Sequence, residues 1–354
     1  MATQALSTGV TAPITKPSRF SKRTQEWIAG LIFVAPAVVI IAVFVLIPMV
    51  LALGVSFTDW TGIQTLDHAN FVGIQQYQHL LFEDGPLRND FFMALKNTVY
   101  YSLGVVPAQT IIALLLAIIV NQKFLKAKGF FRTAFYFPSI TSSVAISVVF
   151  LWLFNKDGII NKVAGLNVTW TDDLHGVFQN FLGLFGITIR NAPGFLIHTT
   201  VFGQTLWNWM SGPSVSMLAI MILATWTTVG TLMLIFLAAL QDVPAPLYEA
   251  AAVDGATRWQ IFRKITVPML RPTTFFVITI GLIGTLQMFD QSYIISGGTG
   301  NPAGTTLSVA LVVYRNAFGS FNAGLGAATA FILFVIIMVF TLIQRRITGN
   351  GSNT

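Results

Sequence analysis

The sequence predicts an all-α polytopic membrane protein, and three observations support this fold class. First, the 354 residues are 54% hydrophobic and only 9% charged, whereas soluble domains contain roughly 25% charged residues. Second, six segments are long and apolar enough to cross a membrane, which requires about 20 such residues each. Third, the basic residues lie mainly in alternate connections between these segments, as in chains that cross a membrane repeatedly.

The six predicted transmembrane helices divide the chain into spans, loops and two polar tails. The first span contains Pro36 and Pro48, so we expect it to tilt or kink. The tails are residues 1–26 and 347–354, on either side of a membrane domain of residues 27–346. The six spans are residues 27–57, 98–120, 133–154, 215–240, 273–296 and 323–344.

The distribution of Lys and Arg orients these spans. The tails and the second and fourth loops carry 14 of the 20 basic residues, so by the positive-inside rule we expect both termini in the cytoplasm. The net charge of +7 therefore follows the topology and does not indicate nucleic-acid binding. The outer loops are then residues 58–97, 155–214 and 297–322.

The longest outer loop, residues 155–214, contains the apolar stretch 178–189, which is too short to span. Phe178, Phe181 and Phe185 recur at helical spacing within it. We therefore predict a helix that lies on the membrane surface.

Several classes of chemistry lack the residues they need. The chain contains no cysteine and no GxxxxGK[ST] sequence, which excludes thiolate metal sites and a phosphate-binding loop of its own. The four histidines lie in outer segments without metal-ligand spacing, so we predict no catalytic residue and no metal site. Asp290 is the only acidic residue in a predicted span, which disfavours a carrier driven by an ion gradient.

A membrane enzyme acting on lipid-linked sugars is a rival from a different class. Such an enzyme needs acid–base or metal-binding carboxylates clustered at one interface. The predicted cytoplasmic loops offer only Asp242, Glu249 and Asp254. All three belong to one connection, residues 242–272, whose local pattern indicates another role.

This connection predicts two short helices joined by a turn. Pro246 suits the first turn of a helix, which we expect over residues 247–254. Gly255 follows, at the position where many helices end in a left-handed residue. The first helix is rich in alanine, which permits close approach of another backbone.

The second helix begins at the capping-box pattern Thr257-x-x-Gln260, and we expect Pro268 to end it. Trp259 and Phe262 provide apolar anchors on its surface. Isolated helices shorter than about 12–15 residues are marginal in water. The pair therefore needs a surface on which to pack, either the body of its own chain or a partner.

Residues 248–268 resemble the EAA loop of ABC importer permeases, and the whole connection 242–272 is called the EAA segment below. EAAAVDGATRWQIFRKITVP is similar in particular to the maltose-type carbohydrate permeases, which favour Asp-Gly-Ala at its middle, here residues 254–256. FVAPAVVIIAVFVLIPMVLALGVSF, FFRTAFYFPSI, WLFNKDGIIN and MFDQSYIISGG resemble further segments of that family in the same order. The resemblance covers residues 27–346 and implies the type I ABC importer permease architecture. The residues that match the EAA pattern are Glu249, Ala250, Ala251, Gly255, Ile265 and Pro268.

The resemblance implies an ATP-driven, binding-protein-dependent importer of a sugar or oligosaccharide in the cytoplasmic (inner) membrane of a prokaryote. The implied partners are a second permease of related fold, a homodimeric or heterodimeric ABC ATPase and an extracytoplasmic solute-binding protein. ATP and Mg²⁺ would be bound by the ATPase, and this chain would hold no cofactor. Polyols and glycerol phosphates are alternative solutes, because related permeases carry them.

The resemblance also implies site residues. The solute path would be lined mainly by uncharged polar groups, as suits a sugar. Because Ser and Thr also pack helices together in membranes, a purely structural role stays open for each hydroxyl. The expected ATPase contacts are Glu249, Ala250, Ala251, Gly255 and Phe262, with Asp254 and Trp259 beside them. The expected solute-path residues are Ser139, Ser143, Thr228, Thr231, Gln287 and Asp290.

Two departures from the family affect the outer face. The loop 155–214 is longer than the family's version, with an apparent insertion around residues 172–210. Residues 296–302 are SGGTGNP, where the family often has Gly-Gly-Pro. Solute and binding protein are recognised on this face, so the sequence leaves the identity of the sugar open.

Overall fold

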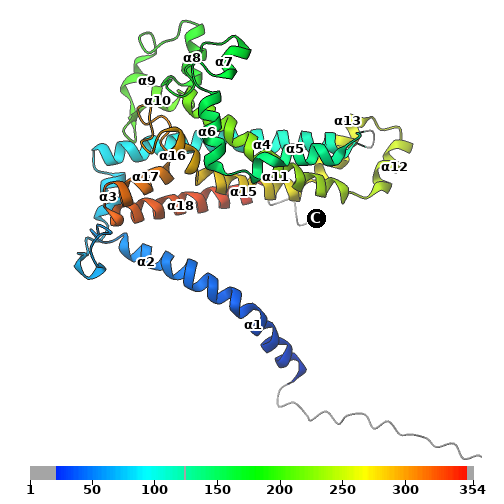
Figure 1. Ribbon diagram of the computed structural model, residues 1–354, viewed down its shortest axis with the longest axis horizontal. Helices are drawn as coiled ribbons and strands as arrows, with labels where there is room; N and C mark the ends of the chain where they lie inside the picture. Colours follow the sequence, from blue (N-terminus) through cyan, green and yellow to red (C-terminus); the bar gives the residue numbers. More distant parts are fainter. Residues whose placement is uncertain (1–20, 123–124, 349–354) are drawn as a thin grey trace, which may run out of the picture. The chain divides into compact units, whose positions relative to one another are not determined.

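The computed structural model describes residues 21–122 and 125–348, and it is helical almost throughout (Figure 1). The chain divides into two compact units, Met1–Ala52 and Leu53–Thr354. Within the described residues, five helices are long and apolar enough to span a membrane, or six if one bent pair counts as a single span. The predicted all-α polytopic fold class is confirmed.

Residues 22–55 form one apolar helical segment that includes a wide turn. It consists of α1 (Lys22–Ile41), the π-helical turn η1 (Ala42–Leu46) and α2 (Ile47–Val55). The Ser21 hydroxyl caps its start by accepting a hydrogen bond from the Thr24 N–H at 3.3 Å. The helix therefore begins inside the expected polar tail, of which residues 1–20 lie outside the described residues.

Proline explains the wide turn. The ring of Pro48 would clash with the carbonyl four residues earlier in a regular α-helix. In η1 the Ile47 N–H instead reaches back five residues to the Ala42 carbonyl, and this wider turn makes room for the ring. The expected distortion of the first span is thus a π turn.

The second unit is built on four long helices. These are α4 (Pro86–Asn121), α11 (Val215–Gln241), α15 (Arg271–Leu286) and α18 (Ala323–Thr348). Helix α4 packs against α11 and α15, and α15 packs against α18. Three buried apolar clusters follow one another along α4, around Phe91, Val105 and Ala117. The position of α4 therefore determines where the other helices lie.

The expected third span, residues 133–154, is not one straight helix. It is divided between α5 (Lys128–Ile140) and α6 (Ser143–Leu153), which meet at an angle of 97°. Thr141 and Ser142, between them, have extended backbone, and the Thr141 hydroxyl donates to the Phe137 carbonyl at 2.9 Å. Helix α5 lies along the bundle and packs on α11, whereas α6 turns away and packs on α16 (Asp290–Ile295) (Figure 1).

Shorter elements cover the ends of the long helices. Helices α3 (Gln75–Leu81) and α17 (Val309–Tyr314) pack on α4, and η4 (Arg315–Gly319) packs on α17 and α18. The short turn η2 (Leu66–His68) precedes α3. The loop 155–214 forms α7 (Ile159–Ala164), α8 (Val177–Leu184), α9 (Gly194–His198), the antiparallel strands β1 (Thr200–Val201) and β2 (Gln204–Thr205), and α10 (Leu206–Trp209). Helix α8 occupies the first part of the predicted surface helix, and its Phe178 and Phe181 side chains are exposed.

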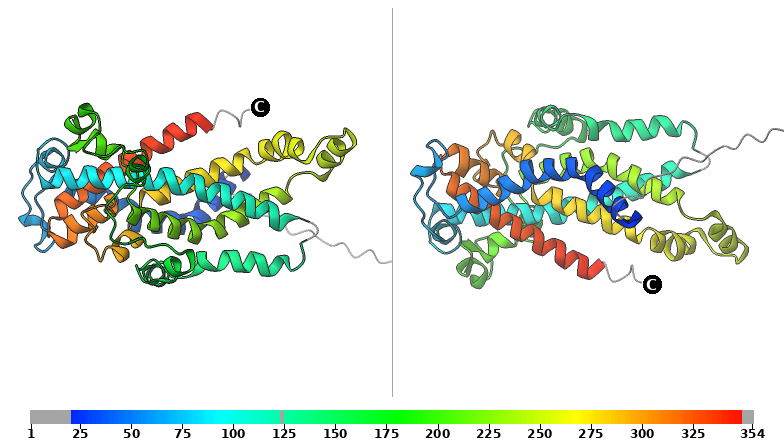
Figure 2. Two further views of the ribbon diagram at one scale, coloured as in Figure 1. Left: turned by 90° about the horizontal axis from the view of Figure 1, so that it is seen from above. Right: turned by 90° about the horizontal axis from the view of Figure 1, so that it is seen from below.

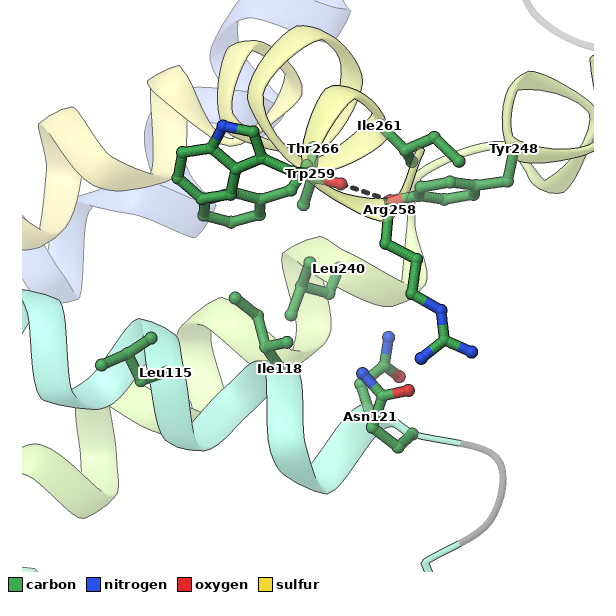
Figure 3. Close-up of a pocket in the computed structure, with 11 residues that line it drawn as sticks. Leu115, Ile118, Asn121, Leu240, Tyr248, Arg258, Trp259, Ile261 and Thr266 are labelled. Atoms are coloured by element: carbon green, nitrogen blue, oxygen red, sulfur yellow. Dashed lines mark hydrogen bonds between the residues drawn. The ribbon is translucent and has the colours of Figure 1, made fainter. Parts of the chain in front are cut away.

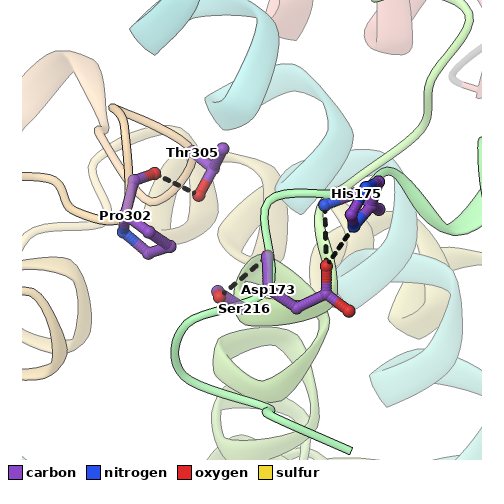
Figure 4. A network of polar contacts seen from close by, with 5 residues as sticks. All are labelled: Asp173, His175, Ser216, Pro302 and Thr305. Atoms are coloured by element: carbon purple, nitrogen blue, oxygen red, sulfur yellow. Dashed lines mark hydrogen bonds and ion pairs between the residues drawn. The ribbon is translucent and has the colours of Figure 1, made fainter.

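The loop 155–214 is joined to the start of α11 through Asp173 (Figure 4). One carboxylate oxygen of Asp173 accepts hydrogen bonds from the backbone N–H of His175 at 2.9 Å and contacts its Nδ1 at 2.8 Å. The Ser216 hydroxyl donates to the Asp173 carbonyl at 3.1 Å. In the nearby glycine-rich turn, the Thr305 hydroxyl donates to the Pro302 carbonyl at 2.7 Å.

The EAA segment extends past the ends of α4 and α11, and α3 and α17 lie at the opposite end of the second unit (Figure 2). It comprises α12 (Ala245–Val253), α13 (Arg258–Ile261), the π turn η3 (Phe262–Thr266) and α14 (Val267–Met269). Pro268 does not end the second helix as expected. The Val267 N–H reaches back to the Phe262 carbonyl, so the π turn accommodates Pro268 as η1 accommodates Pro48.

Candidate functional site

The turn between α12 and α13 has the predicted geometry. Gly255 has φ +72°, in the left-handed region, where a residue with a Cβ is strained. Its N–H donates to the Ala252 carbonyl at 3.1 Å, and the Ala256 N–H donates to the Ala251 carbonyl at 2.9 Å. These bonds satisfy carbonyls that the end of α12 would otherwise leave free.

The predicted capping box at the start of α13 is also confirmed. The Gln260 N–H donates to the Thr257 hydroxyl at 3.3 Å, and the Thr257 N–H donates to the Gln260 side-chain oxygen at 2.7 Å. This reciprocal pair fixes the first turn of a helix that is only four residues long before it widens into η3.

The expected ATPase-contact residues divide into an exposed and an inward-facing group. Glu249, Ala250, Asp254 and Gly255 are exposed. Trp259 is 66% exposed, whereas Ala251 is only 9% exposed. Phe262 is half-buried, and its ring lies 5.5 Å from that of Trp259. Within residues 21–122 and 125–348, Glu249 forms no ion pair.

Val253 is a surface residue of the EAA segment that the sequence reasoning missed. Its side chain is 89% exposed at the end of α12, close in sequence to the turn at Gly255, and Leu247 on the same helix is 41% exposed. Its position directly before the polar Asp254-Gly255 turn is the sequence feature that could have indicated its exposure. Val253 and Leu247 add apolar area to the exposed surface of α12.

A cleft of about 590 Å³ lies between the EAA segment and the ends of α4 and α11 (Figure 3). The Tyr248 hydroxyl and the Thr266 hydroxyl lie 3.3 Å apart at its edge and connect α12 to η3. Phe262 and Trp259, expected as ATPase contacts, both line this cleft. The full lining is Leu115, Ile118, Asn121, Gln122, Leu240, Tyr248, Arg258, Trp259, Ile261, Phe262 and Thr266.

Among the expected solute-path residues, Ser139 is engaged in helix packing. Its hydroxyl donates to the Thr227 carbonyl at 2.6 Å and accepts a hydrogen bond from the Thr231 N–H at 3.2 Å. The contact is possible because Gly230 lacks a side chain: a Cβ there would lie 2.1 Å from the Phe135 carbonyl oxygen. Ser139 thus joins α5 to α11.

Thr228 contacts Gln109, a buried polar residue that was not predicted from the sequence. Its hydroxyl lies 2.7 Å from the Gln109 side-chain oxygen and 2.8 Å from the Ala224 carbonyl. Gln109 is 2% exposed, on α4. A Cβ at Gly281, on α15, would lie 2.5 Å from its amide nitrogen. Gln109 was identifiable as the only side-chain amide in the predicted span 98–120.

The remaining expected residues of the path do not contact Gln109. Thr231 is exposed on α11, one turn after Thr228. Gln287 and Asp290 are exposed where α15 breaks before α16. Ser143, on the helix that packs against α16, has a buried hydroxyl without a partner among the described residues. Ser139, Thr228 and Thr231 thus lie where α5 and α4 pack on α11, Ser143 and Asp290 lie on the packed helices α6 and α16, and Gln287 lies between α15 and α16.

Comparison with known proteins agrees with this architecture. The chain is 31% identical to the lactose transport system permease protein LacF of Rhizobium radiobacter, over 92% of this chain and 96% of that protein. It is 29% identical to the arabinooligosaccharides transport system permease protein AraP of Bacillus subtilis (strain 168), over 94% and 90% of the two chains.

A solved structure shares the fold. A chain of the bacterial alginate ABC transporter, in complex with an alginate pentasaccharide-bound periplasmic protein, superimposes with a TM-score of 0.62 at 21% identity, over 94% of this chain and 97% of that one. Residues 109–349 match the family described as "binding-protein-dependent transport system inner membrane component". The chain therefore belongs to this family of ABC importer permeases.

Proposed function

We propose that this permease imports a sugar or oligosaccharide and that the EAA segment is the contact through which a partner ATPase drives it. The exposed, locally rigid EAA segment carries the proposal, because the chain has no phosphate-binding loop of its own. The capping box and the Gly255 turn fix its backbone. Glu249, Val253 and Trp259 are exposed, so a partner can contact them. The relatives named as lactose and arabinooligosaccharide permeases support a carbohydrate as the solute.

The proposed complex contains a second permease of related fold, a homodimeric or heterodimeric ABC ATPase and an extracytoplasmic solute-binding protein. The ATPase binds ATP and Mg²⁺, and this chain holds no cofactor. Both termini and the EAA segment face the cytoplasm of a prokaryote, in keeping with the distribution of basic residues. The loop 155–214 then faces the binding protein.

In this proposal the chain performs no covalent chemistry. ATP shifts the population of the complex because it binds one conformation more tightly than another. The contact at Glu249, Ala250, Ala251, Asp254, Gly255, Trp259 and Phe262 transmits that preference to the spans. Thr231, Gln287 and Asp290, which are exposed, present polar groups to the solute, whereas Ser139 holds α5 on α11. Thr228 and Ser143 would join them in a conformation that frees their hydroxyls, which here are bonded and buried, respectively.

Co-purification tests the contact with the ATPase. We expect wild type, extracted in detergent, to retain an ATPase and a second permease, and Glu249→Lys to lose the ATPase alone, because the charge is inverted at an exposed position. Asp67→Lys is the matched control, since it makes the same change at an exposed carboxylate of a proposed outer loop. Loss of the ATPase in both variants, or in neither, would contradict the proposed contact.

Transport into proteoliposomes tests the solute. The complex is reconstituted into proteoliposomes, and its binding protein is added on the side that the binding protein contacts. Labelled oligosaccharides, polyols and glycerol phosphate are then supplied on that side, one at a time. We expect ATP-dependent uptake of an oligosaccharide, abolished by Glu249→Lys. Uptake restricted to a polyol or to glycerol phosphate would be consistent with the proposed ATPase contact, but it would contradict a carbohydrate as the solute.

A further inference from the structure

We propose that the cleft between the EAA segment and the ends of α4 and α11 binds one anionic phospholipid. Its lining changes character along α4: Leu115 and Ile118 are apolar, and Asn121 and Gln122 follow at the end of the helix. This is the order in which a membrane changes from acyl chains to headgroups. The cleft therefore lies at the depth where a lipid has its glycerol and phosphate groups.

The polar half of the cleft suits a phosphate. The Arg258 side chain extends from α13 toward Asn121 (Figure 3), and the amide of Gln122 lines the same half. A guanidinium and two amide NH₂ groups are all hydrogen-bond donors, and Arg binds phosphate oxygens in a bidentate geometry. Trp259 lies toward the Leu115 end of the cleft, away from the Arg258 guanidinium (Figure 3), and it is a residue type enriched at membrane–water interfaces.

The apolar half suits an acyl chain. Leu240 lies beside Ile118 (Figure 3), and Leu115 and Phe262 are further apolar residues of the lining. Leu115 is 52% exposed, and it continues into the exposed apolar surface formed by Ile111 and Ile119 on the same helix. An acyl chain can therefore enter the cleft from the lipid-facing side of α4 without crossing a polar barrier, whereas a soluble anion would leave this wall exposed to water.

Charge also favours an anionic occupant. Residues 121–132 and 258–271, which contribute Asn121, Gln122 and Arg258 to the lining, contain eight Lys or Arg residues and no Asp or Glu. Tyr248 lines the cleft from α12, where Glu249 is the one acidic residue. Basic pockets between membrane helices on the cytoplasmic side bind anionic headgroups. A lipid held by Arg258 and by α4 joins the EAA segment to the bundle, and this binding does not require the ATPase.

Lipid titration of the purified, delipidated full-length chain tests the proposal by native mass spectrometry. We expect dioleoyl phosphatidylglycerol to bind more tightly than dioleoyl phosphatidylcholine, and Arg258→Gln to weaken phosphatidylglycerol binding about tenfold. Arg263→Gln, the same charge change at an exposed position of the EAA segment that does not line the cleft, should change it less than about twofold. Arg258→Lys should recover part of the affinity.

A second variant separates a lipid from a free phosphate. Ile118→Trp fills the apolar half and leaves Arg258 in place, so it should also lower phosphatidylglycerol binding about tenfold. The proposal fails if inorganic phosphate displaces the lipid, or if Arg263→Gln acts like Arg258→Gln, which would indicate diffuse attraction. Release of the lipid on addition of the ATPase would show that the cleft is a binding site for the ATPase instead of a lipid, and would also contradict the proposal. Since no ATPase is needed for binding, failure of the proposed coupling contact leaves this test unaffected.

Discussion

Gln109 shows how a single polar residue inside the bundle can connect three helices. Its buried amide contacts Thr228 on α11 and fits the space left by Gly281 on α15. A buried polar group without a partner is costly, so each of the three positions constrains the others. The sequence contains all three residues, but their convergence is a property of the packed bundle, which periodicity along one helix cannot show.

Thr228→Val should destabilise the protein by about 1 kcal/mol, because it removes the hydroxyl that contacts the Gln109 amide. Thermal unfolding in detergent measures the change. Thr225→Val is the matched control, since the Thr225 hydroxyl bonds only to the Met221 carbonyl of its own helix. A double variant, Gln109→Leu with Thr228→Val, should recover most of the loss, and equal losses in the Thr225 and Thr228 variants would show that the Gln109 contact contributes nothing.

Gly255→Ala should weaken ATPase co-purification through backbone strain alone. No atom lies within 4 Å of a Cβ at this position, but φ is +72°, so the substitution costs about 1 kcal/mol. Gly255→Asn should be milder, because Asn tolerates the left-handed region. Gly129→Ala, at an equally open position without a positive φ, is the control. Equal effects of Ala at 129 and 255 would refute the argument from strain.

At the level of elements, local signals predict local structure well. The capping box at Thr257 and the left-handed Gly255 could both be predicted from the sequence, because each depends on bonds between residues a few positions apart. The 97° bend between α5 and α6 could not be predicted from the sequence. Hydropathy is continuous across residues 133–154, and the polar run Thr141–Ser142–Ser143 supports either helix packing or a break.

Thr257→Ala should loosen α13 by about 1 kcal/mol, since it removes the capping side chain. Hydrogen exchange of the Gln260 backbone N–H, which donates to the Thr257 hydroxyl, measures this loosening directly. Thr257→Ser keeps the hydroxyl and should preserve protection. If Ala and Ser exchange alike, the π turn and α14 hold the element without its cap.

At the scale of the whole molecule, close helix contact depends on Gly230. Here α5 crosses α11 so tightly that a Cβ would lie 2.1 Å from the Phe135 carbonyl oxygen, and the Ser139 bonds form beside it. Hydropathy predicts which residues are in the membrane, but it does not predict which helices touch. Small residues at interfaces are the usual means of such approach in membranes.

Gly230→Ala should therefore lower stability by about 1–3 kcal/mol, because α5 must move away from α11. The midpoint of thermal unfolding in detergent checks this. Gly284→Ala, on α15 with open space around the added Cβ, should cause no loss, since Ala favours helix over Gly. A tolerated Gly230→Ala would mean that the two helices separate at little cost.

The π turn at Phe262–Thr266 has a consequence for how force passes through the EAA segment. A π turn holds one residue more than an α turn, so the side chains that follow it are turned by about 100°, one residue's share of a 3.6-residue turn, relative to an unbroken α-helix. Pro268 has no N–H and cannot fit a regular α turn here, so it holds the wide turn at this place. The helix after η3 therefore keeps a fixed rotation relative to α13, and a movement of α13 is passed on without a change of register.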